Sequence, residues 1–170
     1  MKQGRSIALA LAIGFQFVVI FSMVVFKMAV LIRGTNVMLK IEPVDPRDWL
    51  RGDHVIFQYD ISNVPSHLVG QDVKMGDSVY VLLTEQDPYW QATRVQKQKP
   101  TEELLFIKGT VRSPGKKTTN IRYGIEQYFI PEGTGKGFSF RDKESAAEVA
   151  IDKYGNAVLK QIYVDGKKWP

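Results

Sequence analysis

The chain of 170 residues contains no cysteine and only two histidines, His54 and His67. The absence of cysteine excludes disulfides, thiol catalysis and most structural zinc sites. Neither histidine has a cluster of carboxylates around it in the sequence, so we expect no metal ion and no cofactor. We also expect no nucleic-acid partner. The net charge is only +5, and the basic residues are scattered, with no basic stripe and no aromatic–basic RNA-binding signature.

The N-terminal segment consists of one long hydrophobic run. Residues 6–26 are almost entirely apolar, and only Gln16 and Ser22 interrupt them. As a helix this run is about 30 Å long, which matches the hydrocarbon core of a bilayer. Lys27 follows, and the apolar residues then continue to Arg33. Residues 1–33 are therefore predicted to be a transmembrane anchor in the lipid bilayer, with Gln16 and Ser22 able to bond a neighbouring helix.

A cleaved signal peptide is the alternative interpretation of this segment. Its hydrophobic region would span about 7–15 residues and end in small residues at the cleavage site. The run here is longer, and bulky side chains follow Lys27, so we favour an uncleaved signal-anchor. Lys2 and Arg5 favour a cytoplasmic N-terminus, whereas Lys27, Arg33 and Lys40 on the far side weaken that asymmetry. With this orientation, residues 34–170 form a domain outside the cytoplasm.

The rest of the chain is typical of a mainly β domain, because short β-branched and aromatic segments alternate with turn residues. We expect a twisted antiparallel sheet or partly open barrel after the transmembrane helix. A few helical turns are predicted at 143–148, and Gly124 predicts a bulge in one long strand at 120–130. The other strands are expected at 36–41, 54–61, 78–84, 90–96 and 104–112, with a hairpin of 149–153 and 157–164.

A tight turn at 51–53 leads into the central strand. Gly52 permits a positive φ, and Asp53 can bond the backbone that follows it. From there the residues alternate with period two, which places Val55, Phe57, Tyr59 and Ile61 on one face of the strand. The opposite face also carries some apolar side chains, so we expect this strand to be paired on both sides. The simplest interpretation is a folding element rather than a site of chemistry.

The residues Gly52-Asp53-His54-Val55-Ile56-Phe57-Gln58-Tyr59 resemble the signature of the GDYXXLXY family of bacterial membrane-anchored proteins. The signature residues Gly52, Asp53 and Tyr59 match, whereas His54 replaces a tyrosine and Phe57 replaces a leucine. The stretch 123–133 also resembles a later block of that family. The resemblance implies a membrane protein of uncharacterised activity that acts with a larger multi-spanning membrane protein.

Three acids near these blocks are candidate functional residues: Asp53, Glu126 and Glu132. They could form a carboxylate pair or a cation site. The alternative is that they cap turns or pair with Arg51 and Arg122.

The anchor followed directly by a β domain also favours a signal-peptidase-like topology. Those enzymes carry a nucleophilic serine nine positions before the aspartate that matches Asp53, and Val44 occupies that position. No catalytic residue is therefore predicted. We expect a non-catalytic accessory or binding protein of the bacterial envelope. An atypical envelope hydrolase related in fold to signal peptidases is the alternative, and a purely structural spacer is a third.

Overall fold

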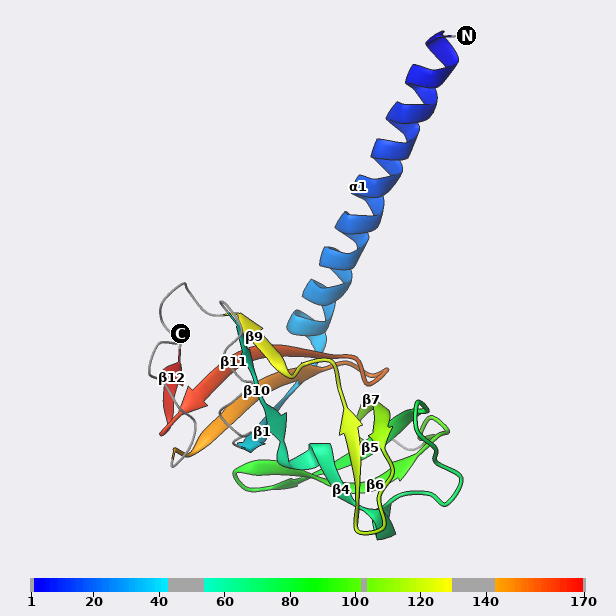
Figure 1. The fold of residues 1–170 in the computed structure, drawn as a ribbon. Coiled ribbons are helices and arrows are strands. Elements are labelled where there is room, and N and C mark those ends of the chain that lie inside the picture. The colour runs from blue at the N-terminus through cyan, green and yellow to red at the C-terminus, as the bar shows by residue number, and fades with distance from the viewer. Residues whose placement is uncertain (1, 43–53, 102–103, 130–142, 170) are drawn as a thin grey trace.

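A long N-terminal helix projects from a β-sheet body in the computed structural model (Figure 1). The structure describes residues 2–42, 54–101, 104–129 and 143–169. The helix, α1, spans Lys2–Arg33 and leads directly into the first strand. The fold is therefore mainly β with one N-terminal apolar helix, as the sequence predicts.

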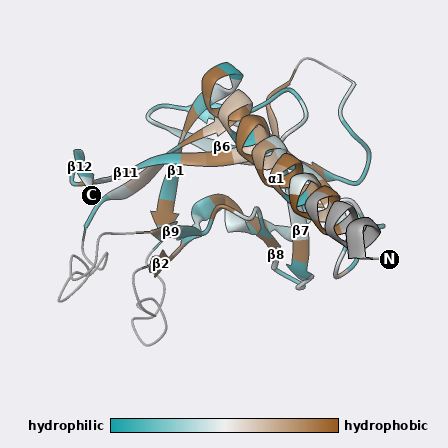
Figure 2. Ribbon diagram, turned by 90° about the horizontal axis from the view of Figure 1, so that it is seen from above, coloured by the Kyte–Doolittle hydropathy of each residue, from teal (hydrophilic) through white to brown (hydrophobic). Residues whose placement is uncertain are grey.

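Most of the described apolar side chains of α1 are exposed, and only those near its C-terminal end pack against the body. Phe15, Phe17 and Phe21 are each about 70% exposed, and the coloured part of α1 in Figure 2 is mostly brown, that is, hydrophobic. Residues Leu11–Arg33 form a segment long and apolar enough to cross a membrane, a property that a signal sequence at this position would share. Such exposure in water would carry a large free-energy cost, which burial in lipid removes.

The strands form two five-stranded sheets and one two-stranded sheet, and all named strand pairs are antiparallel. The sheet orders are β12-β11-β10-β1-β3, β4-β8-β7-β5-β6 and β2-β9, and over the described residues they do not close into a barrel. Two short 3-10 helices flank β4. The bounds are β1 Thr35–Glu42, β2 His54–Ile56, β3 Gln58–Tyr59, η1 Asp60–Ser62, β4 Asn63–Pro65, η2 Ser66–Leu68, β5 Ser78–Gln86, β6 Tyr89–Gln96, β7 Phe106–Ser113, β8 Thr118–Arg122, β9 Gln127–Phe129, β10 Ser145–Ile151, β11 Ala157–Val164 and β12 Lys167–Trp169.

One hydrophobic core lies between the sheets. Alternate residues of β1 point into it (Val37, Leu39 and Ile41), as do Val79 and Val81 of β5. This period-two burial is the pattern expected for strands with one face on a core.

Two predictions about secondary structure are wrong. The helical turns expected at 143–148 are not formed, because residues 145–151 are the strand β10, paired with β1 and β11. The single strand expected at 120–130 is instead two strands, β8 and β9. They are separated by a turn in which Gly124 has a φ of +81°.

The junction between α1 and the body is closely packed. Val30 is only 2% exposed, and its carbonyl oxygen accepts a hydrogen bond from the Gly34 N–H at 2.8 Å. A Cβ atom at Gly34 would lie 2.5 Å from that same oxygen and 3.0 Å from the backbone N and O of Ile151 in β10. The chain therefore passes from helix to strand against the backbone of β10, where only glycine fits.

We expect Gly34→Ala to lower the stability of the full chain by about 1–3 kcal/mol, because the added methyl group overpacks this junction. Thermal unfolding in a neutral detergent, followed by circular dichroism, measures the effect. Gly14→Ala is the matched control, since a Cβ at Gly14 meets nothing within 4 Å. Equal melting temperatures for the two variants would contradict the close packing.

Candidate functional site

We call residues 54–59 the signature strand; they belong to two of the sheets, and the chain that follows enters the third. His54–Ile56 pairs with β9, and two residues later Gln58–Tyr59 pairs with β1. After the 3-10 turn η1, Asn63–Pro65 pairs with β8. The expectation that the strand is paired on both sides is wrong for these described residues, because each part has one partner strand and the partner changes at Phe57.

Hydrogen bonds tie this strand to the segment between β8 and β9. The Tyr59 hydroxyl donates to the Ile125 carbonyl oxygen at 2.7 Å, and the Phe57 N–H donates to the Glu126 carbonyl oxygen at 3.1 Å. In the other direction, the Tyr123 hydroxyl donates to the Ile61 carbonyl oxygen at 2.5 Å. The two segments are more than 60 residues apart in the sequence, and each donates hydrogen bonds to the other. We call these three bonds the signature clasp.

The inward face of the signature strand is fully buried, as the alternation predicts. Val55, Phe57, Tyr59 and Ile61 are each at most 2% exposed. The Phe57 and Tyr59 rings meet edge to face with centroids 5.4 Å apart, a favourable geometry for aromatic pairs. Two of the signature positions are therefore core residues.

Glu126 holds the turn between β8 and β9. Its carboxylate accepts hydrogen bonds from the N–H groups of Tyr123 and Gly124, the latter at 2.8 Å. The Arg122 Nε lies 3.7 Å from the Glu126 Oε2. The side chain is mostly buried, so these bonds supply the hydrogen-bonding partners that a buried carboxylate requires. Glu126 therefore caps this turn and pairs with Arg122, which is the alternative role that the sequence suggests for it.

A cleft of ≈ 310 Å³ lies beside this turn, within the range of small-ligand sites. We call it the signature cleft. Amide and guanidinium side chains dominate its polar lining, which suits hydrogen bonding to a peptide or another polar ligand. It is lined by Ile56, Phe57, Gln58, Ser62, Arg112, Asn120, Ile121, Arg122, Glu126 and Gln127.

Gly52, Asp53 and Glu132 lie outside the described residues, and His54 is described only by its backbone, which pairs with Phe129.

Sequence reasoning missed Gln58, Arg112 and Asn120, since ordinary strand residues become lining residues only through the sheet pairing. Among the described residues no group of three or more His, Asp or Glu could hold a metal ion.

The fold and the clasp define a class of protein: a single N-terminal hydrophobic helix on a β body closed by its signature strand. The model of the GDYXXLXY protein family matches residues 16–162, so the chain belongs to the GDYXXLXY family. A search of curated proteins and a search of solved structures each found no match. A signal-peptidase-like topology therefore stays a prediction.

We expect Tyr59→Phe to lower stability by about 1–3 kcal/mol, because the buried Ile125 carbonyl would lose its donor. Urea unfolding of the full chain in detergent measures the loss. Tyr128→Phe is the control, because Tyr128 is only partly buried and its hydroxyl has no hydrogen bond within the part of the chain that the structure describes. A Tyr59→Phe variant as stable as the control would show that the clasp contributes little.

The two tyrosines of the signature clasp, Tyr59 and Tyr123, also determine how stability should depend on alkaline pH. Burial, and secondarily the charge of Glu126, raises the pKa of both Tyr59 and Tyr123 well above its ordinary value. The unfolded chain releases these protons near pH 10, whereas the folded chain keeps them. Stability therefore falls as the pH rises above about 10, and Tyr59→Phe makes that fall less steep.

Urea unfolding at several alkaline pH values measures this slope, and absorbance at 295 nm follows ionisation in the folded protein. Ionisation of all seven tyrosines together near pH 10, without unfolding, would contradict the assignment.

Proposed function

We propose that this protein is a single-pass, non-catalytic accessory protein of the bacterial envelope, whose β body stands outside the cytoplasm and acts with a multi-spanning membrane protein. The observation that carries the proposal is the closely packed junction at Val30 and Gly34, which joins an apolar helix to the body without a linker. Such a junction holds the body at a set position next to the bilayer. A module that works beside a membrane partner gains from this placement, because its binding surface is already positioned.

The polar residues of α1 support a partner within the membrane. Gln16 lies in the apolar segment, and no hydrogen bond to its side chain is found among the described residues. In lipid an amide without a partner is costly, and a neighbouring helix can satisfy it. Ser22 differs, because its hydroxyl donates to the Val19 carbonyl oxygen of its own helix at 2.7 Å. Gln16 rather than Ser22 is therefore the residue that needs a partner helix.

The described part of the signature supports a structural role for it. Phe57 and Tyr59 fill the core, and Glu126 caps a turn, so these residues build the body instead of presenting reactive groups to solvent. The hydrolase alternative has no described observation in its favour, and it rests on Asp53 and Glu132, which lie outside the described residues. The signature cleft gives the accessory protein a polar surface on which to accept a partner segment.

We expect Gln16→Leu to reduce copurification of a multi-spanning membrane protein about threefold, the typical value of one interhelical hydrogen bond. The full chain is isolated from membranes in a mild detergent, and the recovered proteins are quantified by mass spectrometry. Ser22→Ala is the matched control and should leave recovery unchanged. Recovery of the wild-type chain without a multi-spanning protein, or equal recovery with Gln16→Leu, would contradict the proposal.

A further inference from the structure

A second pocket, of ≈ 540 Å³, lies where α1 ends. Three parts of the chain that are distant in the sequence form it: the junction of α1 and β1, residues 99–101 and 104–105 between β6 and β7, and the start of the turn between β10 and β11. Figure 1 shows this last turn on the side of the body that faces the helix. We call it the junction pocket; its lining residues used below are Arg33, Lys99, Thr101, Leu104, Asp152 and Lys153.

Among the described residues that line the junction pocket, positive charges outnumber negative ones. Arg33, Lys99 and Lys153 line it, against one described carboxylate, that of Asp152. No carboxylate of the described residues lies within ion-pair distance of any of these three cations. All three side chains are exposed, so their charges are accessible to a ligand from solvent.

The carboxylate of Asp152 already accepts hydrogen bonds within its own turn, between β10 and β11. Its Oδ1 accepts hydrogen bonds from the backbone N–H groups of Tyr154 at 2.8 Å and Asn156 at 2.9 Å, and its Oδ2 accepts one from the Asn156 side chain. Gly155 in the same turn has a φ of +80°, and a Cβ there would lie 2.9 Å from the Phe106 ring. The Asp152 turn is therefore fixed in shape and holds Lys153 beside the pocket.

An aromatic ring and an aliphatic side chain accompany the cations. Tyr154 is 49% exposed, and its ring centre lies 5.0 Å from the Lys99 Nζ and 5.1 Å from the Lys153 Nζ. Leu104, in the pocket lining, is 45% exposed. Aromatic and basic side chains gather in this way at the boundary between lipid and water, where one end of each group is apolar and the other polar.

We propose that the junction pocket binds the phosphate-bearing headgroup of an anionic phospholipid, with Arg33, Lys99 and Lys153 around the phosphate and Leu104 beside the acyl chains. This inference rests on the proposed membrane anchor, because Arg33 ends the membrane-spanning segment and so places the pocket at headgroup level. Juxtamembrane basic residues are attracted to anionic lipid in this way. Glu102 and Glu103 follow Thr101 in the sequence but lie outside the described residues, and a measurement on the whole chain includes their charge.

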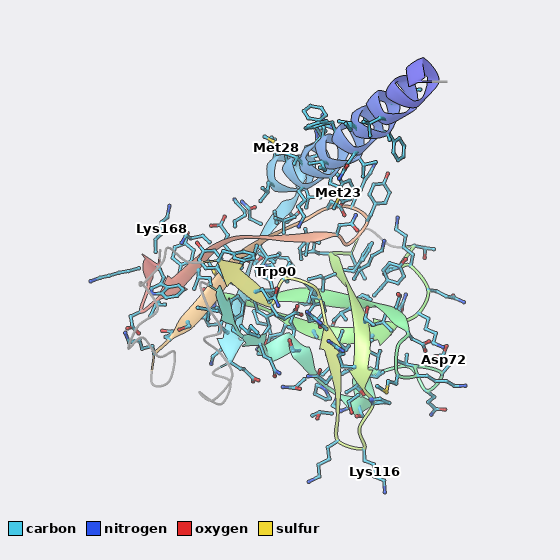
Figure 3. All side chains as sticks on the ribbon, turned by 45° about the horizontal axis from the view of Figure 1, so that its top comes forward. Met23, Met28, Asp72, Trp90, Lys116 and Lys168 are labelled. Atoms are coloured by element: carbon cyan, nitrogen blue, oxygen red, sulfur yellow. The ribbon has the colours of Figure 1, made fainter. Side chains whose placement is uncertain are left out.

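The test is native mass spectrometry of the full chain in a neutral detergent, titrated with phosphatidylglycerol or phosphatidylcholine. The wild-type chain should retain phosphatidylglycerol in preference to phosphatidylcholine. Lys99→Gln with Lys153→Gln should weaken that retention on the order of tenfold, since each basic residue near anionic lipid contributes a several-fold factor. Lys116→Gln with Lys117→Gln is the charge-matched control and should bind as the wild type does. Both are exposed, and Figure 3 shows Lys116 at the end of the body far from the helix.

Three results would overturn the inference: no preference for the anionic lipid, equal retention by the two double variants, or displacement of the lipid by excess inorganic phosphate, which would indicate a free-phosphate site. Alkaline carbonate extraction of membranes separates this failure from failure of the proposed function. A chain that stays in the membrane fraction but ignores phosphatidylglycerol contradicts the lipid site alone. A chain released into the soluble fraction contradicts the anchor itself.

Discussion

The body depends on the pairing of the signature strand with the segment between β8 and β9. A strand of ordinary geometry would stay in one sheet, but here the backbone leaves β9 at Ile56 and joins β1 at Gln58. The polar backbone groups freed by that change must find partners, because a buried unpaired group costs about as much as a lost hydrogen bond. The Glu126 carbonyl accepts the Phe57 N–H, and the Tyr59 and Tyr123 hydroxyls serve two further carbonyls. Three sheets are held around one core as a result.

Two residues of the short family pattern, Phe57 and Tyr59, lie inside this arrangement. The pattern's last tyrosine, here Tyr59, is completely buried and reaches a carbonyl that no other side chain in this arrangement serves. Phe57 stands at the position of the pattern's leucine and is likewise apolar, and it is buried. The side chains that can fit at these two positions are therefore tightly constrained. Gln58, which lies between them in the sequence, instead lines the signature cleft at the surface.

Local patterns predicted much of this fold and little of its sites. The hydrophobic run, the alternation from Val55 to Ile61 and the turn residues placed the helix and most strands. Alanines at 146 and 147 favoured a helix, but burial between β1 and β11 made them a strand, since tertiary packing overrides a weak propensity. The Asp165-Gly166 pair, with φ of 49° and 73°, was a readable hairpin signal that leads to the missed β12. The two pockets join loops and strands from distant parts of the chain, so no local pattern could reveal them.

The absence of a linker at Gly34 has a mechanical consequence. Because α1 is joined firmly to the β body, any change in the tilt of α1 moves the β body sideways. Helices adjust their tilt when the thickness of the surrounding bilayer changes. For an anchor embedded as proposed, a neighbour that presses on the helix or thins the lipid around it would reorient the β body without touching it.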